Sequence, residues 1–187
     1  YRKFMQLIGH EYFHQWNVKR LRPKEYINYN YSKEVLSENL WFAEGVTSYI
    51  DVFLPFLAGI TSEKNLYRDL ESLITRYYNS PGRQYQSLSQ SSIESWIKLY
   101  KSNPTSIDNQ ISYYNLGSII ALCLDIRLRE KNKSLSYLLR QLWSDTLILK
   151  NGYSRNIILK ILSNIDINIS NDLSSWLDIP GHVDIEN

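Results

Sequence analysis

Residues 10–14 read His-Glu-Tyr-Phe-His, with two histidines four positions apart. On an α-helix of 3.6 residues per turn, this spacing places both imidazoles on one face. They can then bind a single Zn²⁺ while Glu11 lies beside the metal, free to act as a base. Phe4, Leu7 and Ile8 flank the motif, and this apolar stripe predicts that the helix is buried along that side.

The composition predicts one folded domain without a nucleic-acid-binding surface. The 187 residues suffice for a hydrophobic core, so we treat residues 1–187 as a single domain. The 21 basic and 19 acidic residues give a net charge of only +2, without the basic excess typical of nucleic-acid-binding domains. No secretory signal opens the sequence, and no apolar run has transmembrane length. We therefore expect a soluble protein without a membrane segment, cytoplasmic rather than exported.

The pattern of apolar residues predicts a mainly α fold, a bundle of several helices. Glycine and proline are scarce, with seven and five residues, which suits helices joined by short loops. No pair of strands with hairpin spacing stands out. Ser91 and Glu94 have the spacing of a capping box at the start of a short helix. We expect the other helices at residues 2–18, 37–54, 63–78, 112–130, 134–149 and 154–163, with a weaker turn at 172–177.

A catalytic zinc site usually has three protein ligands and an open position for water, so two histidines need a third partner. Glu44 lies within an apolar helical stretch, where an unpaired charge is costly. A cation satisfies this carboxylate better than any lysine or arginine nearby in the sequence. Glu34 and Glu38 are the alternatives, and Glu34 lies in polar loop sequence. The residues alone favour Glu44 without excluding the other two.

Longer segments resemble the glycyl aminopeptidase family of zinc metallopeptidases. Its thermolysin-like members combine His-Glu-x-x-His with a glutamate and often carry a PDZ domain. Residues 10–23 are similar to the family's zinc-binding signature, and residues 40–49 to its glutamate-bearing helix. The second segment also resembles the Trp-x-x-Glu-Gly-Phe-Ala segment of the aminopeptidase N family. Residues 111–117 resemble the family's tyrosine segment, and the similarity extends from residue 1 to about residue 176.

The resemblance implies a fold and a set of site residues. The chain is expected to be the C-terminal helical part of a thermolysin-like catalytic domain, a fragment without the upstream β part and the downstream PDZ domain. His10, His14 and Glu44 are implied as ligands of Zn²⁺. Glu11 is implied as the general base that takes a proton from the attacking water.

Tyr114 is implied as the hydrogen-bond donor to the transition state, because related enzymes place this tyrosine three residues before a glycine, here Gly117. The family often has lysine at the position of Leu116, and this departure leaves Tyr113 as the alternative. Gly117 and Ala121 share a helix face with Tyr114, so they predict a shallow groove where a substrate or another backbone can approach.

Ser48 and Asp51 are candidates for orienting a metal-bound histidine. They lie one and two helical turns after Glu44, on roughly the same face. Metal-bound histidines usually donate their second N–H to a carboxylate or a carbonyl. An ordinary position on the helix surface explains either residue equally well.

The function implied by the resemblance is that of a bacterial zinc-dependent aminopeptidase, which releases small N-terminal residues such as glycine or alanine from peptide substrates. Two alternatives stay open. One is an endopeptidase of the thermolysin type, and the other is a non-catalytic helical scaffold or peptide-binding module. We expect neither a nucleic acid nor a membrane as a partner.

Overall fold

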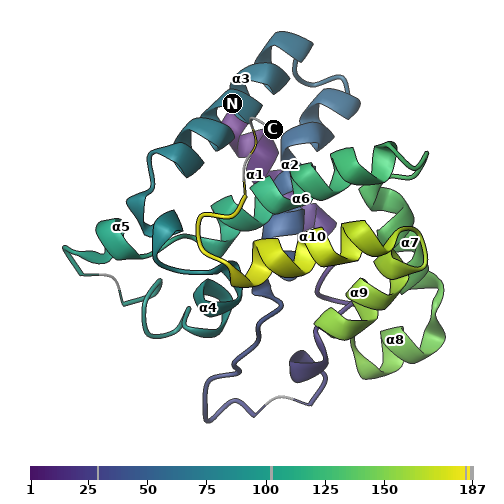
Figure 1. The fold of residues 1–187 in the computed structure, drawn as a ribbon. Coiled ribbons are helices and arrows are strands. Elements are labelled where there is room, and N and C mark those ends of the chain that lie inside the picture. Colours follow the sequence, from purple (N-terminus) through teal and green to yellow (C-terminus); the bar gives the residue numbers. More distant parts are fainter. Residues whose placement is uncertain (29, 102, 184, 186–187) are drawn as a thin grey trace.

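The computed structural model describes residues 1–28, 30–101, 103–183 and 185, the side chain at position 107 excepted. Within these residues the chain is mainly α-helical, as predicted, and forms no strand beyond isolated bridges (Figure 1). The helices are α1 (Arg2–Phe13), α2 (Val46–Leu57), α3 (Glu63–Tyr78), α4 (Leu88–Ile93), α5 (Ser106–Asn109), α6 (Tyr113–Arg129), α7 (Leu135–Ser144), α8 (Thr146–Asn151), α9 (Arg155–Ser163) and α10 (Ile167–Asp178). A π-helical turn, Trp41–Gly45, precedes α2, and 3₁₀ turns cover Lys24–Tyr26 and Pro81–Gln84.

α6 forms the centre of the bundle because apolar residues occur on most of its faces. Leu116, Ile119, Ile120, Leu124 and Leu128 are all buried, although they point to different sides of the helix. The other elements therefore surround it, and α2, α3, α4, α7 and α10 all pack against α6 (Figure 1). A helix that is hydrophobic all round belongs in the interior of a domain.

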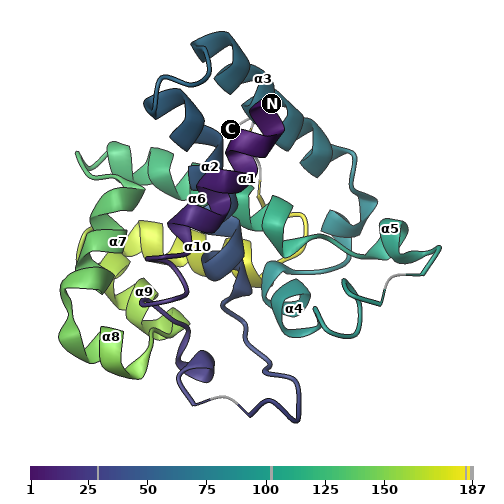
Figure 2. The same cartoon turned by 180° about the vertical axis from the view of Figure 1, so that it is seen from behind.

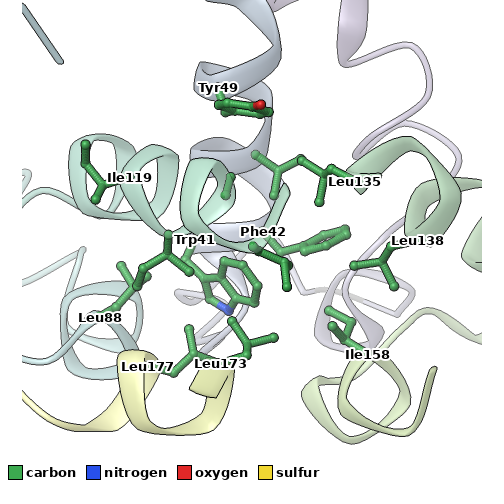
Figure 3. Packing of buried hydrophobic residues seen from close by; sticks show 14 of the residues in the cluster. Trp41, Phe42, Tyr49, Leu88, Ile119, Leu135, Leu138, Ile158, Leu173 and Leu177 are labelled. Atoms are coloured by element: carbon green, nitrogen blue, oxygen red, sulfur yellow. The ribbon is translucent and has the colours of Figure 1, made fainter. Parts of the chain in front are cut away.

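The core beside α6 is built on two aromatic side chains that precede Glu44. Trp41 and Phe42 are buried, and their rings meet edge to face with centroids 5.4 Å apart. Leucine and isoleucine side chains from α4, α7, α9 and α10 surround them (Figure 3). Burying each large apolar side chain stabilises the fold by about 1.5–3 kcal/mol. The element that carries Glu44 is therefore anchored in the hydrophobic core.

α1 is shorter than predicted. It ends at Phe13 rather than at residue 18, and His14 follows as its C-terminal cap. The chain then turns back through Val18, whose φ is 114°. A positive φ is unusual for a β-branched residue, so the turn that follows the second histidine carries backbone strain.

The orientation of α1 also differs from the prediction. Phe4, Leu7 and Ile8 are 60%, 55% and 44% exposed, so the expectation that they bury the helix is wrong. α1 packs on α2 instead through the opposite face, where Gly9 is buried against Leu54. Figure 2 shows α1 at the front of the molecule, over α2 and α6. The polar face of the helix is thereby turned inward.

Two helices have boundaries that depend on aspartate caps. The helix predicted at 134–149 is divided into α7 and α8 at Asp145. The Asp145 side chain accepts hydrogen bonds from two backbone N–H groups of the next turn and so starts a new helix. The weak turn predicted at 172–177 is part of α10, which begins after Asp166 with the same type of cap. Such caps satisfy N–H groups that lack a partner at a helix start.

The predicted capping box at Ser91 and Glu94 is wrong. The box forms one turn earlier, where the Ser87 side chain accepts from the Gln90 backbone and the Gln90 side chain accepts from the Ser87 backbone. Ser91 lies inside α4 and donates its hydroxyl to the carbonyl of Ile111. Among the described residues no helix is long and apolar enough to cross a membrane.

Candidate metal centre

Three side chains from two separate elements converge on one point. His10 and His14 come from the last turn and the cap of α1, and Glu44 comes from the π-helical turn. The Glu44 Oε2 atom lies 3.3 Å from His10 Nε2 and 3.2 Å from His14 Nε2. Each residue thus offers one ligand atom to a group that could hold a metal ion.

The spacing of these atoms fits a tetrahedral metal ion. Zinc bonds to histidine nitrogen and carboxylate oxygen are about 2.0–2.2 Å long, so tetrahedral ligand atoms lie about 3.3–3.5 Å apart. The two measured contacts with Glu44 Oε2 are close to this separation. Two neutral imidazoles and one carboxylate are also a common ligand set in catalytic zinc sites.

Both imidazoles are oriented by the ring nitrogen that faces away from Glu44. His10 Nδ1 lies 2.8 Å from Asp51 Oδ2, and His14 Nδ1 lies 3.0 Å from the carbonyl oxygen of Asn17. If Nδ1 donates its proton to these acceptors, Nε2 is left with a free lone pair in both rings. Gln6 extends this arrangement, because its Nε2 donates to the other oxygen of Asp51 at 2.6 Å. The predicted orienting role of Asp51 therefore has a geometric basis.

The charges of the three side chains depend on one another. Burial lowers the pKa of His10, but hydrogen bonds to Asp51 and Glu44 outweigh burial and raise this pKa to about 9. Burial raises the pKa of Glu44, but the two histidines outweigh burial and lower this pKa to about 2. The pKa of His14 is raised as well, against the effect of burial, chiefly by its hydrogen bond to Glu44. The site favours positive charge beside Glu44, and a cation that binds there must displace protons from the imidazoles.

Asn17 connects the histidine turn to the glutamate turn. Its side-chain amide is buried and donates to the carbonyls of Phe42 and Ala43, at 2.9 and 3.1 Å, and approaches the Thr47 hydroxyl at 3.1 Å. The backbone carbonyl of Asn17 faces His14 Nδ1 and orients that imidazole. A π-helical turn displaces backbone carbonyls from the regular helical ladder, and such turns are frequent at functional sites. One asparagine therefore contacts both elements that carry the candidate metal ligands.

The glutamate turn and α6 cross at two glycines. A Cβ atom added to Gly45 would lie 2.5 Å from the Cα of Gly117, and one added to Gly117 would lie 2.9 Å from the Cα of Gly45. Neither position can hold a larger residue unless the backbones separate. The groove predicted at Gly117 is thus filled by another backbone. This crossing brings Glu44, which precedes Gly45, close to Tyr114, which precedes Gly117 by one turn.

Glu11 and Tyr114 line one cavity of about 410 Å³ together with His10. The rings of His10 and Tyr114 have centroids 6.3 Å apart. Burial, followed by the nearby Glu44 carboxylate, raises the pKa of Tyr114, so its hydroxyl keeps its proton and can donate a hydrogen bond. Tyr113 is only 1% exposed and lies 3.0 Å from the Tyr100 hydroxyl. The geometry thus favours Tyr114 over Tyr113 as a group that can meet a ligand.

Three other residues considered from the sequence lie apart from the ligand group. Ser48 has no hydrogen bond to either imidazole among the described residues, so the structure gives it no orienting role. Glu34 is exposed. Glu38 approaches Arg155 at 3.7 Å rather than the histidines. The residues that sequence reasoning missed are Asn17 and Gln6, because each acts through a backbone or a carboxylate whose position the sequence does not give.

The sequence model of the M61 glycyl aminopeptidase family matches residues 3–120, more than half of the chain. The chain belongs to this family. The range matched by the M61 family model contains His10, His14, Glu44 and Tyr114. Comparison with curated protein sequences gives no match.

A solved structure shares the fold over nearly the whole chain. This relative, described as an aminopeptidase N family protein from Idiomarina loihiensis, is 34% identical in sequence and superimposes with a TM-score of 0.93. The aligned region covers 99% of this chain and 32% of the relative. The chain therefore spans about a third of the length of the solved protein.

Proposed function

We propose that this chain supplies the helical, zinc-binding part of a metallopeptidase that acts as an aminopeptidase. The observation that supports zinc most directly is the meeting of two Nε2 atoms and one carboxylate oxygen, with both Nδ1 atoms facing an acceptor. Membership of the M61 glycyl aminopeptidase family supports peptide hydrolysis at an N-terminus. The name of the family favours small N-terminal residues, such as glycine or alanine.

His10, His14 and Glu44 hold the ion in this proposal. Zinc, when bound, acts as a Lewis acid and leaves one coordination position open for the reaction. Asp51 and the Asn17 carbonyl keep the imidazoles in the tautomer that can bind it.

Glu11 and Tyr114 perform the proton transfer and the stabilisation of charge. Both residues line the cavity at His10. Glu11 takes the proton of the attacking water and gives it to the leaving amine. The Tyr114 hydroxyl, which stays protonated, donates a hydrogen bond to the oxygen of the scissile carbonyl as negative charge develops there.

The test compares Glu11→Gln with His10→Ala, because the two residues have different roles. Glu11→Gln should retain zinc by elemental analysis and lose more than 100-fold in hydrolysis of alanine amide, since general base catalysis contributes about 10²–10⁴-fold. His10→Ala should lose both zinc and hydrolysis. Near-normal hydrolysis by Glu11→Gln would contradict the mechanism.

The whole zinc-loaded peptidase that contains this chain should cleave free peptides and spare N-blocked ones. Ala-Ala-Ala and its N-acetylated form differ only at the amino group that an aminopeptidase recognises. Equal cleavage of both would instead identify an endopeptidase. Zinc-loaded protein that cleaves neither peptide would reject the proposal of a peptidase.

A further inference from the structure

A second cavity opens beside the candidate metal centre. It has a volume of about 340 Å³ and lies between α1, α2, α3 and α6. Lys3, Gln6, Asp51 and Tyr114 line both this cavity and the one at His10 and Glu11. A ligand that reacts at the first cavity can therefore extend into the second.

The acidic groups of the second cavity already have partners on both oxygens. Asp51 accepts from Gln6 on Oδ1 and faces His10 on Oδ2. Asp69 contacts Lys3 at 3.0 Å through Oδ1 and Arg2 at 3.4 Å through Oδ2. Two cations therefore share the one carboxylate of Asp69.

Arg76 adds a further positive charge to this cavity. It lies on α3, two helical turns after Asp69, and lines the cavity with Tyr114 and Ser118. Arg76 is exposed, and its guanidinium has no hydrogen bond and no ion pair with the residues that the structure describes. A guanidinium presents paired N–H donors that match the two oxygens of a carboxylate. The cavity thus has an unneutralised donor group and no carboxylate left to pair with it among the described residues.

The dimensions suit a short peptide. His10 and Lys3, which lie seven residues apart on α1, are separated by about 10 Å along the helix axis. An extended peptide advances about 3.3 Å per residue, so about three residues bridge this distance. A peptide that reacts at His10 and Glu11 can therefore extend along α1 as far as Lys3, which lines the second cavity together with Arg76.

We propose that the second cavity is a carboxylate subsite, in which Arg76 binds an acidic group on the leaving part of a peptide substrate. This inference rests on the proposed peptidase function and adds a substrate class to it. The carboxylate is either the C-terminus of a short peptide or an acidic side chain near the scissile bond. Both have the same chemistry and are separated by the choice of substrate.

The test measures kcat/KM of the zinc-loaded protein on two matched pairs of peptides. Ala-Ala-Ala and its C-terminal amide differ in the terminal carboxylate, and Ala-Glu-Ala-amide and Ala-Gln-Ala-amide differ in a side-chain carboxylate. Arg76 is exposed, and exposed charge pairs contribute up to about 1 kcal/mol, so the preferred acidic peptide should exceed its neutral partner about twofold to fivefold. The pair that shows the preference identifies the source of the carboxylate.

Arg76→Gln should reduce this acid-to-neutral ratio to near one, mainly through KM. Arg76→Lys should keep part of the ratio, because it retains the charge but loses the paired donors. Arg68→Gln is the matched control, because Arg68 and Arg76 are both exposed arginines on α3 but only Arg76 lines the cavity. It should leave the ratio unchanged. A ratio near one in the unaltered protein, or an unchanged ratio in Arg76→Gln, overturns the subsite.

Calorimetric titration with Ala-Ala-Ala and Ala-Glu-Ala-amide separates failure of the subsite from failure of the peptidase proposal. If the unaltered protein cleaves none of the four peptides, the peptidase proposal fails and binding decides the subsite. Weaker binding of either acidic peptide by Arg76→Gln than by Arg68→Gln supports the subsite. Equal binding by the two variants, or no binding to the unaltered protein, overturns it.

Discussion

α1 and α6 supply side chains to the same cavity, but they bury opposite kinds of surface. α6 is buried along most of its surface by apolar residues such as Ile120 and Leu124, although Ile126 is exposed. α1 turns Gln6 and His10 inward and leaves Phe4 and Leu7 exposed. α6 is therefore held by hydrophobic packing, whereas α1 is positioned by hydrogen bonds and ion pairs with α2, α3 and the glutamate turn. The helix that carries the histidines leaves apolar side chains exposed and turns inward the polar side chains that form the candidate site.

The largest effect on stability should come from the core of α6. Leu124→Ala should lower the free energy of unfolding by about 2–5 kcal/mol, because it leaves a cavity in packed surroundings. Leu7→Ala removes the same atoms from the exposed face of α1 and should change stability by less than about 0.5 kcal/mol. Urea unfolding measures both. Equal losses would show that α1 is buried on its apolar side in solution.

Asn17→Ala should have the next largest effect. It removes a buried amide that holds the carbonyls of Phe42 and Ala43, so stability should fall by about 1–3 kcal/mol. The turn that carries Glu44 should lose its fixed position, and zinc affinity should fall as well. Urea unfolding with and without a chelator separates the two losses. Zinc affinity equal to that of the unaltered protein would show that Asn17 does not position the ligands.

Asp51→Asn should act mainly on the metal. Removing the carboxylate that faces His10 Nδ1 should weaken zinc binding about 10–100-fold, as is typical for partners of metal-bound histidines. Ser48→Ala is the matched control on the same helix and should leave the affinity unchanged. Competition with a chromogenic zinc chelator measures both variants. A larger loss in Ser48→Ala than in Asp51→Asn would assign the orienting role to the serine.

The smallest effect should come from the strained turn after His14. Val18→Gly relieves a φ of 114° that a valine adopts at a cost, but it also increases the freedom of the unfolded chain. The net change in the free energy of unfolding should lie within about 1 kcal/mol. A loss above this range, measured by urea unfolding, would mean that the valine side chain stabilises the turn by packing.

The sequence brings forward the candidate ligand residues because their evidence is local. The spacing of His10 and His14 places them on one helical face, and the apolar surroundings of Glu44 indicate a buried acid that needs a cation. The helical class is predictable from the apolar pattern for the same reason. Periodicity defines which residues share a face.

Periodicity does not define which face of a helix points inward, and the prediction for Phe4 and Leu7 was wrong for this reason. The role of Asn17 was not predictable either, because it depends on carbonyls displaced by a π-helical turn. The crossing of Gly45 and Gly117 was not predictable, because it depends on the relative position of two elements. The sequence suggested only that a substrate or another backbone could approach Gly117. The capping box forms at Ser87 rather than at Ser91, because Ser87 has an extended backbone whereas Ser91 lies inside α4.

Calorimetric titration of the metal-free protein with Zn²⁺ tests the central claim most directly. The unaltered protein should bind one ion per chain, Glu44→Ala should bind it at least about 100-fold more weakly, and Glu38→Ala, which changes a glutamate outside the ligand group, should bind it normally. Absence of a one-to-one site in the unaltered protein, or unweakened binding by Glu44→Ala, would contradict the account.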